Sequence, residues 1–185
     1  MNILESLEEN PIIAAVRSDA DLAAALTAPP QVIFLLNANI LTISGQIESA
    51  HRCSKAVLVH IDLAEGLGKD AAGTAYLSRL GADGVISTRS SVIRFAKSYG
   101  LCAVQRFFVV DSHSVATAAD AIRAVQPDLA ELMPGIIPKV VQRFCAECTV
   151  PVIAGGLIDS KPEVMAALRA GAAAVSTGAR ALWCE

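Results

Sequence analysis

The 185-residue chain is long enough for one domain with a substantial core, and 54% of its residues are hydrophobic. No apolar run approaches the roughly 18 residues of a membrane span, and the acidic, amphipathic first ten residues are unlike a signal peptide. The net charge of −3, with Lys and Arg scattered along the chain, weighs against a protein that is basic overall in order to bind nucleic acid. We therefore expect a cytoplasmic protein without a membrane partner.

The five cysteines do not form the pattern of a secreted disulfide framework, because their number is odd and the chain is not small. Cys145 and Cys148 make a C-x-x-C pair at the end of a predicted helix, whereas a thioredoxin-type pair follows a strand. Ordinary buried thiols are favoured over a redox or metal role.

Short apolar segments recur about every 20–27 residues, as expected for parallel strands that are buried on both faces. The predicted strands are residues 12–16, 32–36, 56–63, 84–88, 102–110, 129–133, 150–154 and 172–176. Alternating strands and helices give a parallel sheet, either closed or open and doubly wound, and eight strands favour closure. The predicted fold is an α/β, single-domain (β/α)8 TIM-type barrel over residues 1–185. Its loops and helices must be trimmed, because such barrels typically take about 250 residues.

Helix signals lie between these segments. Ser18 and Asp70 are predicted N-caps, a cap at Ser90 is predicted to start a further helix, and another helix is predicted to begin at Ser112. Pro138 is expected in the first turn of another helix.

The last two predicted strands end in small residues: Gly155 and Gly156 in one, and Ser176, Thr177 and Gly178 in the other. In many (β/α)8 barrels the loops after strands seven and eight bind a phosphate, and glycines let backbone N–H groups approach the anion. We interpret these five residues as a phosphate site. The alternative is that tight strand-to-helix turns need the glycines.

Polar residues at the carboxyl ends of the strands are the other candidates for ligand contact, because these ends face the site of a barrel. They are Arg17, His60, Asp62, Gln105, Arg106 and Glu131, with Lys139 in the loop after the sixth strand. His60 and Asp62 are two residues apart and are expected to share a strand face. For the ligand site we select His60, Asp62, Arg106, Glu131 and Lys139: carboxylates accept hydroxyl hydrogen bonds from a polyol, and Arg106 or Lys139 offsets an anion's charge.

A purely structural interpretation competes with this one. Asp62, Glu131 and Arg106 could pair with one another in the barrel interior, since an unpaired charge there is costly. His60 could equally be a satisfied core histidine.

The sequence offers no clear candidate for a catalytic group. Every lysine falls in a predicted helix or loop, so a Schiff-base lysine inside the barrel is not expected. The stretch from His60 to Gly66 looks like the metal-and-base strand of sugar-phosphate epimerases, but His51 and His113 lie outside the predicted strands and cannot complete a metal shell. We predict no catalytic residue, metal or cofactor.

Taken together, these motifs resemble those of the glycerol uptake operon antiterminator regulatory proteins over nearly the whole chain. The matching stretches are residues 11–16, 33–36, 59–67, 83–88, 105–112, 131–139, 151–158 and 174–177. The resemblance implies a trimmed (β/α)8 barrel that senses sn-glycerol 3-phosphate and, when loaded, acts on leader mRNA so that transcription passes a terminator. At Gly178 the chain departs from the family, whose last strand tends towards Ser-Thr-Ser.

An RNA contact would require a local basic face. Arg89, Arg94 and Lys97 on one predicted helix, with Lys69 and Arg79 on its neighbour, are the candidates, although such a group can also be a solvated helix surface. The chain could also form a homodimer, and the sequence does not decide its oligomeric state. The runner-up function is a phosphate-binding barrel enzyme, an isomerase, epimerase or synthase acting on a phosphorylated sugar or polyol. A third is a metabolite-binding protein that works through a protein partner.

Overall fold

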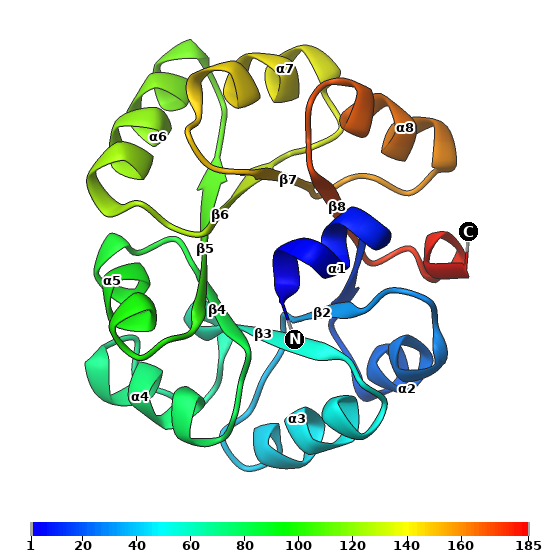
Figure 1. Ribbon diagram of the computed structural model, residues 1–185, viewed down its shortest axis with the longest axis vertical. Coiled ribbons are helices and arrows are strands. Elements are labelled where there is room, and N and C mark those ends of the chain that lie inside the picture. Colours follow the sequence, from blue (N-terminus) through cyan, green and yellow to red (C-terminus); the bar gives the residue numbers. More distant parts are fainter. Residues whose placement is uncertain (1, 185) are drawn as a thin grey trace.

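The structure is a computed structural model that describes residues 2–184. Eight parallel strands form a closed barrel in chain order, and β8 pairs with β1 to complete the ring (Figure 1). The strands are β1 (Ile12–Val16), β2 (Val32–Leu35), β3 (Ala56–His60), β4 (Gly84–Ser87), β5 (Cys102–Phe108), β6 (Leu129–Met133), β7 (Val152–Gly155) and β8 (Ala174–Thr177). The predicted (β/α)8 barrel is confirmed.

Short helices surround the barrel and explain how it fits a short chain. They are α2 (Asp19–Thr27), α3 (Ile43–Arg52), α4 (Ala71–Arg79), α5 (Ser90–Ser98), α6 (Ser112–Val125), α7 (Pro138–Glu147) and α8 (Lys161–Arg169), and a 3-10 helix η2 (Arg180–Cys184) follows β8. The predicted caps Ser18 and Asp70 accept the backbone N–H groups of Asp21 and Gly73. None of the helices within residues 2–184 has the length and apolar character needed to span a membrane.

Asp62 does not share a strand face with His60, which corrects the expectation from spacing. β3 ends at His60, and the chain turns there into a short 3-10 helix, η1 (Ile61–Leu63). The Asp62 carboxylate accepts the backbone N–H of Thr88 at 2.7 Å and the hydroxyl of Ser87 at 2.8 Å. These hydrogen bonds hold the Asp62 side chain against the end of β4.

The N-terminus of α5 also differs from the prediction. Arg89, not Ser90, is the N-cap residue, and no side chain caps the helix there. The backbone N–H of Arg89 donates instead to the Ser87 hydroxyl, and the Ser90 hydroxyl accepts from Gln105.

A helix that the sequence analysis did not predict, α1 (Ile3–Glu9), closes the amino-terminal end of the barrel. It lies across the centre of the ring in Figure 1. Its buried residues Ile3 and Leu7 pack into the same apolar cluster as the inward-facing Val32 and Phe34. A larger apolar cluster joins the outer strand faces to the surrounding helices.

The barrel interior changes from apolar to polar along the strands. At the carboxyl end the inward positions hold His60, Arg106, Glu131 and Ser176, all buried. The strand register sets Arg106 directly beside Glu131. Because α1 seals one end and polar side chains gather at the other, a ligand can enter from the carboxyl end.

The closing role of α1 can be tested with two leucines on the same helix. Leu7 is 3% exposed and Leu4 is 41% exposed. Leu7→Ala should lower the free energy of unfolding by about 2 kcal/mol or more, because it leaves a cavity under the barrel. Leu4→Ala should change it by less than about 0.5 kcal/mol. Denaturant unfolding curves measure both, and equal effects would show that α1 does not contribute to the core.

Candidate functional site

A cavity of about 270 Å³, lined by both polar and apolar residues, opens at the carboxyl ends of the strands. It is lined by Ala15, Arg17, Leu36, Arg106, Glu131, Met133, Gly156, Leu157, Ile158, Asp159, Ser176, Thr177, Gly178 and Ala179. Its volume lies just below the roughly 300–1,000 Å³ of pockets for drug-sized ligands, so it suits a small metabolite. Six of the ten predicted ligand residues line it: Arg106, Glu131, Gly156, Ser176, Thr177 and Gly178.

Glu131 organises the wall of this cavity. Its Oε2 accepts from Nε of Arg106 at 2.6 Å, and its Oε1 accepts from the Ser176 hydroxyl at 2.7 Å. The Glu131 and Arg106 side chains are 1% and 7% exposed, so the pair compensates two buried charges. Within residues 2–184 the terminal Nη groups of Arg106 make no intramolecular bond and can donate to a ligand. Arg106 and Glu131 thus form the ion pair that the structural interpretation of the sequence predicted, whereas Asp62 pairs with neither of them.

The loop after β7 adopts a backbone suited to close approach by a ligand. Gly156 and Leu157 have φ angles of +81° and +61°, and the Leu157 side chain is largely exposed. A bulky residue in this region of conformational space is strained, and such strain is concentrated at functional sites. The loop therefore has a cost in stability that a binding role would explain.

Thr177 joins the two candidate phosphate loops. Its hydroxyl donates to the carbonyl of Ile158 at 2.6 Å and accepts the backbone N–H of Ala179 at 3.0 Å. Its own carbonyl accepts from the indole of Trp183. Because both roles of the hydroxyl are used, Thr177 fixes the loops after β7 and β8 relative to each other.

Two of the predicted glycines differ in the space around them. A Cβ at Gly155 would lie 2.5 Å from both Glu131 Oε1 and Ser176 Oγ, so this glycine is needed for packing behind the cavity wall. At Gly178 the nearest atom to an added Cβ is the Ala15 carbonyl oxygen, at 3.6 Å. The fold itself therefore tolerates a methyl group at Gly178.

Arg17 is one of two charged cavity residues that the predicted site did not include; the other is Asp159. Arg17 follows β1, is exposed, and lines the cavity. Its backbone N–H bonds to Asp21, but its guanidinium has no intramolecular partner within the described residues. Its place at a strand end was visible in the sequence, whereas the absence of a partner was not.

His60 is buried beside this cavity rather than in its lining. It is 3% exposed, and its Nδ1 is buried without a hydrogen-bond partner. Burial lowers the pKa of the imidazole to about 4, and the nearby charge of Arg106 acts in the same direction. His60 is therefore neutral near pH 7.

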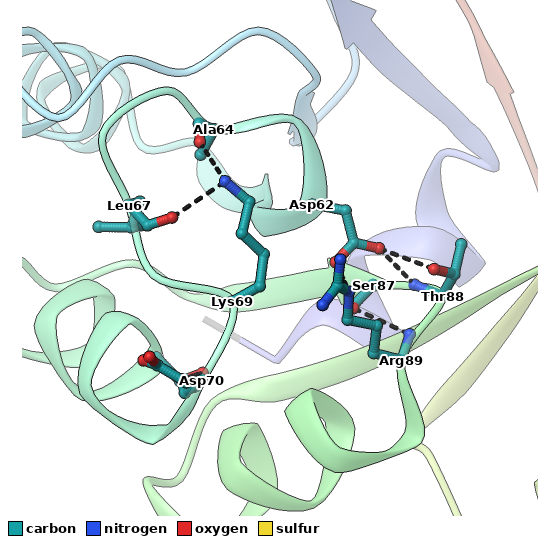
Figure 2. A network of polar contacts seen from close by, with 9 residues as sticks. Asp62, Ala64, Leu67, Lys69, Asp70, Ser87, Thr88 and Arg89 are labelled. Carbon is teal, nitrogen blue, oxygen red and sulfur yellow. Dashed lines mark hydrogen bonds and ion pairs between the residues drawn. The ribbon is translucent and has the colours of Figure 1, made fainter.

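Asp62 belongs to a neighbouring polar network between β3 and α5 (Figure 2). Burial alone would raise the pKa of its carboxyl, but hydrogen bonds from Thr88 and Ser87 outweigh burial and lower it. Arg89 Nε lies 3.6 Å from the carboxylate. Lys69 holds the preceding loop by donating to the Ala64 and Leu67 carbonyls.

The remaining predicted ligand and RNA contacts do not line the cavity. Lys139 lines a separate depression between α6 and α7 with Val110 and Arg143. Arg89 and Lys97 are eight residues apart, about 12 Å along α5, and Lys97 donates to the Gln126 carbonyl. Arg94 is exposed. The three candidate RNA-binding cations thus do not form one compact cluster.

The cysteines are not fully buried, contrary to the expectation: Cys102, Cys145 and Cys148 are half-buried, and Cys53 and Cys184 are exposed. Burial raises the pKa of Cys148 to about 12 and also raises that of Cys145. Thiolates are therefore disfavoured at this C-x-x-C pair. Within residues 2–184 no group of three or more His, Cys, Asp or Glu side chains could hold a metal ion.

The fold and the site define a small (β/α)8 barrel with a cavity at the carboxyl ends of the strands, to which the loops after β7 and β8 contribute. The family model "Glycerol-3-phosphate responsive antiterminator" matches residues 12–183. The chain belongs to this family.

Three proteins similar to this chain share most of its length. The uncharacterized protein YgcP of Escherichia coli K12 is 34% identical over 99% of this chain and 96% of its own length. The crystal structure of a glycerol uptake operon antiterminator regulatory protein from Listeria monocytogenes is 35% identical, covers 94% of this chain and 95% of its own, and has a TM-score of 0.89. An antiterminator-related protein from Thermotoga maritima is 32% identical, with coverages of 93% and 96% and a TM-score of 0.83.

The state of His60 predicts a pH dependence of stability. Its pKa of about 4 in the folded protein lies below the value of 6.5 expected in the unfolded chain. The unfolded chain therefore binds more protons between these values, so the stability present above pH 6.5 is lost as the pH falls towards 4. His60 alone should contribute about 3 kcal/mol to this loss.

The measurement is the free energy of unfolding of the wild type and of His60→Gln at a series of pH values. The variant should lose less stability between pH 6.5 and 4 than the wild type does. His113→Gln, at an exposed position on α6, serves as the control and should keep the wild-type slope. Parallel curves for the wild type and His60→Gln would contradict a neutral buried imidazole.

Proposed function

We propose that the protein is a cytoplasmic antiterminator that binds sn-glycerol 3-phosphate in the cavity at the carboxyl ends of the strands and, when loaded, acts on leader mRNA so that transcription passes a terminator. The proposal is supported above all by Arg17: its guanidinium has no partner within residues 2–184, and it lines the same cavity as the glycine-containing loops after β7 and β8. An anion bound there would gain both backbone N–H groups and a guanidinium.

The phosphate is assigned to the loops that hold Gly155, Gly156, Ser176, Thr177 and Gly178. In this assignment Gly178 provides room for backbone approach, Gly156 supplies the positive φ of the turn, and Gly155 and Thr177 keep the loops in place.

The cations Arg17 and Arg106 would offset the charge of the phosphate. Among the described residues, the whole guanidinium of Arg17 is available to donate hydrogen bonds to the phosphate, and so are the Nη groups of Arg106. Lys139, which lies away from the cavity, would act only through long-range attraction.

The glycerol hydroxyls are assigned to carboxylates. Both oxygens of Glu131 already accept one hydrogen bond each, but every carboxylate oxygen can accept a second. Asp159 at the rim offers further acceptors. His60 and Asp62 lie outside the cavity lining and would act on the ligand indirectly.

Regulation requires that the loaded and empty states differ in their affinity for RNA. The loops that surround the cavity lead into helices at the protein surface. A ligand that orders these loops would therefore also change the conformation of the surface. For RNA contact we retain Arg89, Arg94 and Lys97. Arg94 is the most available of the three, because Arg89 lies near Asp62 and Lys97 binds a carbonyl. A homodimer would double such a contact surface.

The ligand prediction concerns thermal stability. At a concentration 100 times its Kd, sn-glycerol 3-phosphate should stabilise the fold by about 2.7 kcal/mol, measured by calorimetry or thermal shift. Glycerol should stabilise it far less, because it lacks the anion. Equal shifts from the two compounds would remove the phosphate from the proposal.

Gly178→Ala tests the position of the phosphate. The Cβ meets only the Ala15 carbonyl oxygen at 3.6 Å, so the fold should keep its stability to within about 1 kcal/mol. Its methyl group beside the phosphate should lower glycerol 3-phosphate affinity tenfold or more in a titration. Gly45→Ala on α3, where an added Cβ meets nothing within 4 Å, is the matched control and should bind normally. Normal binding by both variants would contradict the assignment.

The RNA prediction separates a regulator from an enzyme. Binding of a leader transcript should strengthen with glycerol 3-phosphate and weaken steeply with salt. Arg94→Glu should weaken RNA binding without changing ligand affinity in RNA-free protein, and Asp120→Asn, at an exposed position of α6, is a control. Turnover of a phosphorylated sugar or polyol, with RNA affinity indifferent to ligand, would instead support a barrel enzyme.

A further inference from the structure

The carboxylate of Asp21, in the first turn of α2, accepts hydrogen bonds from two separate parts of the chain. Its Oδ2 accepts the backbone N–H of Arg17 at 3.2 Å and the Ser18 hydroxyl at 2.9 Å. Its Oδ1 accepts from Nε and Nη2 of Arg180, at 2.8 and 2.5 Å. Asp21 thus joins the turn after β1 to the segment after β8, although 159 positions separate it from Arg180 in the sequence. Both residues lie outside the cavity lining, and the proposed phosphate and glycerol contacts give them no role.

Capping of α2 does not by itself explain this arrangement. Glu163 is the third residue of α8, as Asp21 is of α2, and it caps its helix by accepting the backbone N–H groups of Asp159 and Ser160. Those bonds reach at most four residues along the chain. A capping carboxylate therefore needs no distant cation, so the contact between Asp21 and Arg180 points to a further role.

The same contact is expected to contribute little to the stability of the fold. The Asp21 and Arg180 side chains are 20% and 48% exposed, and ion pairs with such exposure are weak contributors. Burial alone would raise the pKa of the Asp21 carboxyl, but hydrogen bonds, above all those from Arg180, outweigh burial and lower it. Asp21 is therefore charged near pH 7 and forms an ion pair with Arg180.

On the β1 side, the hydrogen bond to Asp21 fixes the backbone from which the Arg17 side chain extends. Arg17 lines the cavity, and its guanidinium has no partner of its own among residues 2–184. No other side chain there directs the guanidinium. The position of the Arg17 backbone is therefore the main constraint on where its guanidinium can reach.

On the β8 side, Arg180 extends from a segment that is itself well anchored. It comes directly after Gly178 and Ala179, which line the cavity. The indole of Trp183, a residue that is 1% exposed, donates to the Thr177 carbonyl at 2.9 Å and so connects η2 to the end of β8. A residue that binds Arg180 is therefore fixed relative to this side of the cavity.

We propose that Asp21, held by Arg180, is a positioning residue that keeps Arg17 in place beside the loop after β8. The inference rests on the proposed function, in which Arg17 and this loop bind the phosphate of sn-glycerol 3-phosphate. Asp21 touches no ligand atom. It raises affinity because a long side chain that is already well placed loses less conformational freedom when it binds. The effect therefore falls on the phosphate rather than on the glycerol hydroxyls.

The test is a calorimetric titration of the protein with sn-glycerol 3-phosphate and, separately, with inorganic phosphate. Asp21→Asn and Arg180→Gln should each weaken both affinities about fivefold, because both changes remove the same contact. The double variant should bind no more than about twofold weaker than either single variant, since the two residues act as one unit. Arg180→Lys should recover most of the affinity that Arg180→Gln loses. Both N–H groups of Arg180 meet the single oxygen Oδ1, which an ammonium group can also reach.

A double-mutant cycle separates positioning from a general loss of structure. In the Arg17→Met background, Asp21→Asn should weaken sn-glycerol 3-phosphate binding further by less than about twofold, because the side chain that Asp21 positions is gone. Asp120→Asn is the matched control. It removes the 2.6 Å ion pair between Asp120 and Arg123 on α6 and should leave the affinity unchanged.

Thermal unfolding shows whether each variant is folded at the temperature of the titration. If Asp21→Asn does not fold, the comparison of Arg180→Gln with Arg180→Lys decides the question. Arg180 is suitable for this purpose because its side chain is half-exposed and the cap of α2 is the Ser18 side chain.

The possible outcomes distinguish the inference from the proposed function. Wild-type affinity in both Asp21→Asn and Arg180→Gln would overturn the inference and leave the proposed function standing. So would a loss of affinity in Asp21→Asn that Arg180→Gln does not share, or that persists in full in the Arg17→Met background, because Asp21 would then act through the structure of α2. A wild-type protein that binds neither sn-glycerol 3-phosphate nor inorganic phosphate would overturn the proposed function, and the inference with it.

Discussion

The buried contact between Arg106 and Glu131 is the constraint on which the cavity depends. Two charges with so little exposure persist only as a pair, and the parallel register of β5 and β6 brings them side by side. Glu131 then accepts the Ser176 hydroxyl from β8. One carboxylate thereby connects three strands across the barrel and leaves the terminal groups of Arg106 for a ligand. The same carboxylate also requires Gly155, since any larger side chain would meet it.

The fold could be predicted because its signals are local and repeated. Parallel strands buried on both faces give short apolar runs, and caps such as Ser18 and Asp70 act within three residues of the helix start. Eight repeats then favour a closed barrel. The small residues of the last two strands could be recognised for the same reason, since their position after strands seven and eight follows directly from the repeat.

The rest of the site depends on contacts between distant segments, which spacing does not reveal. Asp62 was expected beside His60, but hydrogen bonds from residues 87 and 88 turn it towards β4. Lys139 follows the correct strand, yet α7 carries it away from the cavity. Arg17 was recognised as a strand-end residue, but only the folded structure shows that its guanidinium lacks a partner. Helix α1 was missed because seven residues give a weak periodic signal.

A protein that senses a metabolite needs an element whose state depends on occupancy, since a ligand that binds two states equally shifts nothing. The inner wall of the cavity is unsuited to that role, because Glu131, Arg106 and Ser176 are fixed by short hydrogen bonds. The rim is different: Leu157 is held in a strained backbone conformation, and the exposed Arg17 side chain has no partner among residues 2–184. In the proposed function, binding energy gained at the rim would therefore be coupled to the surface, while the rigid wall would determine which ligand fits.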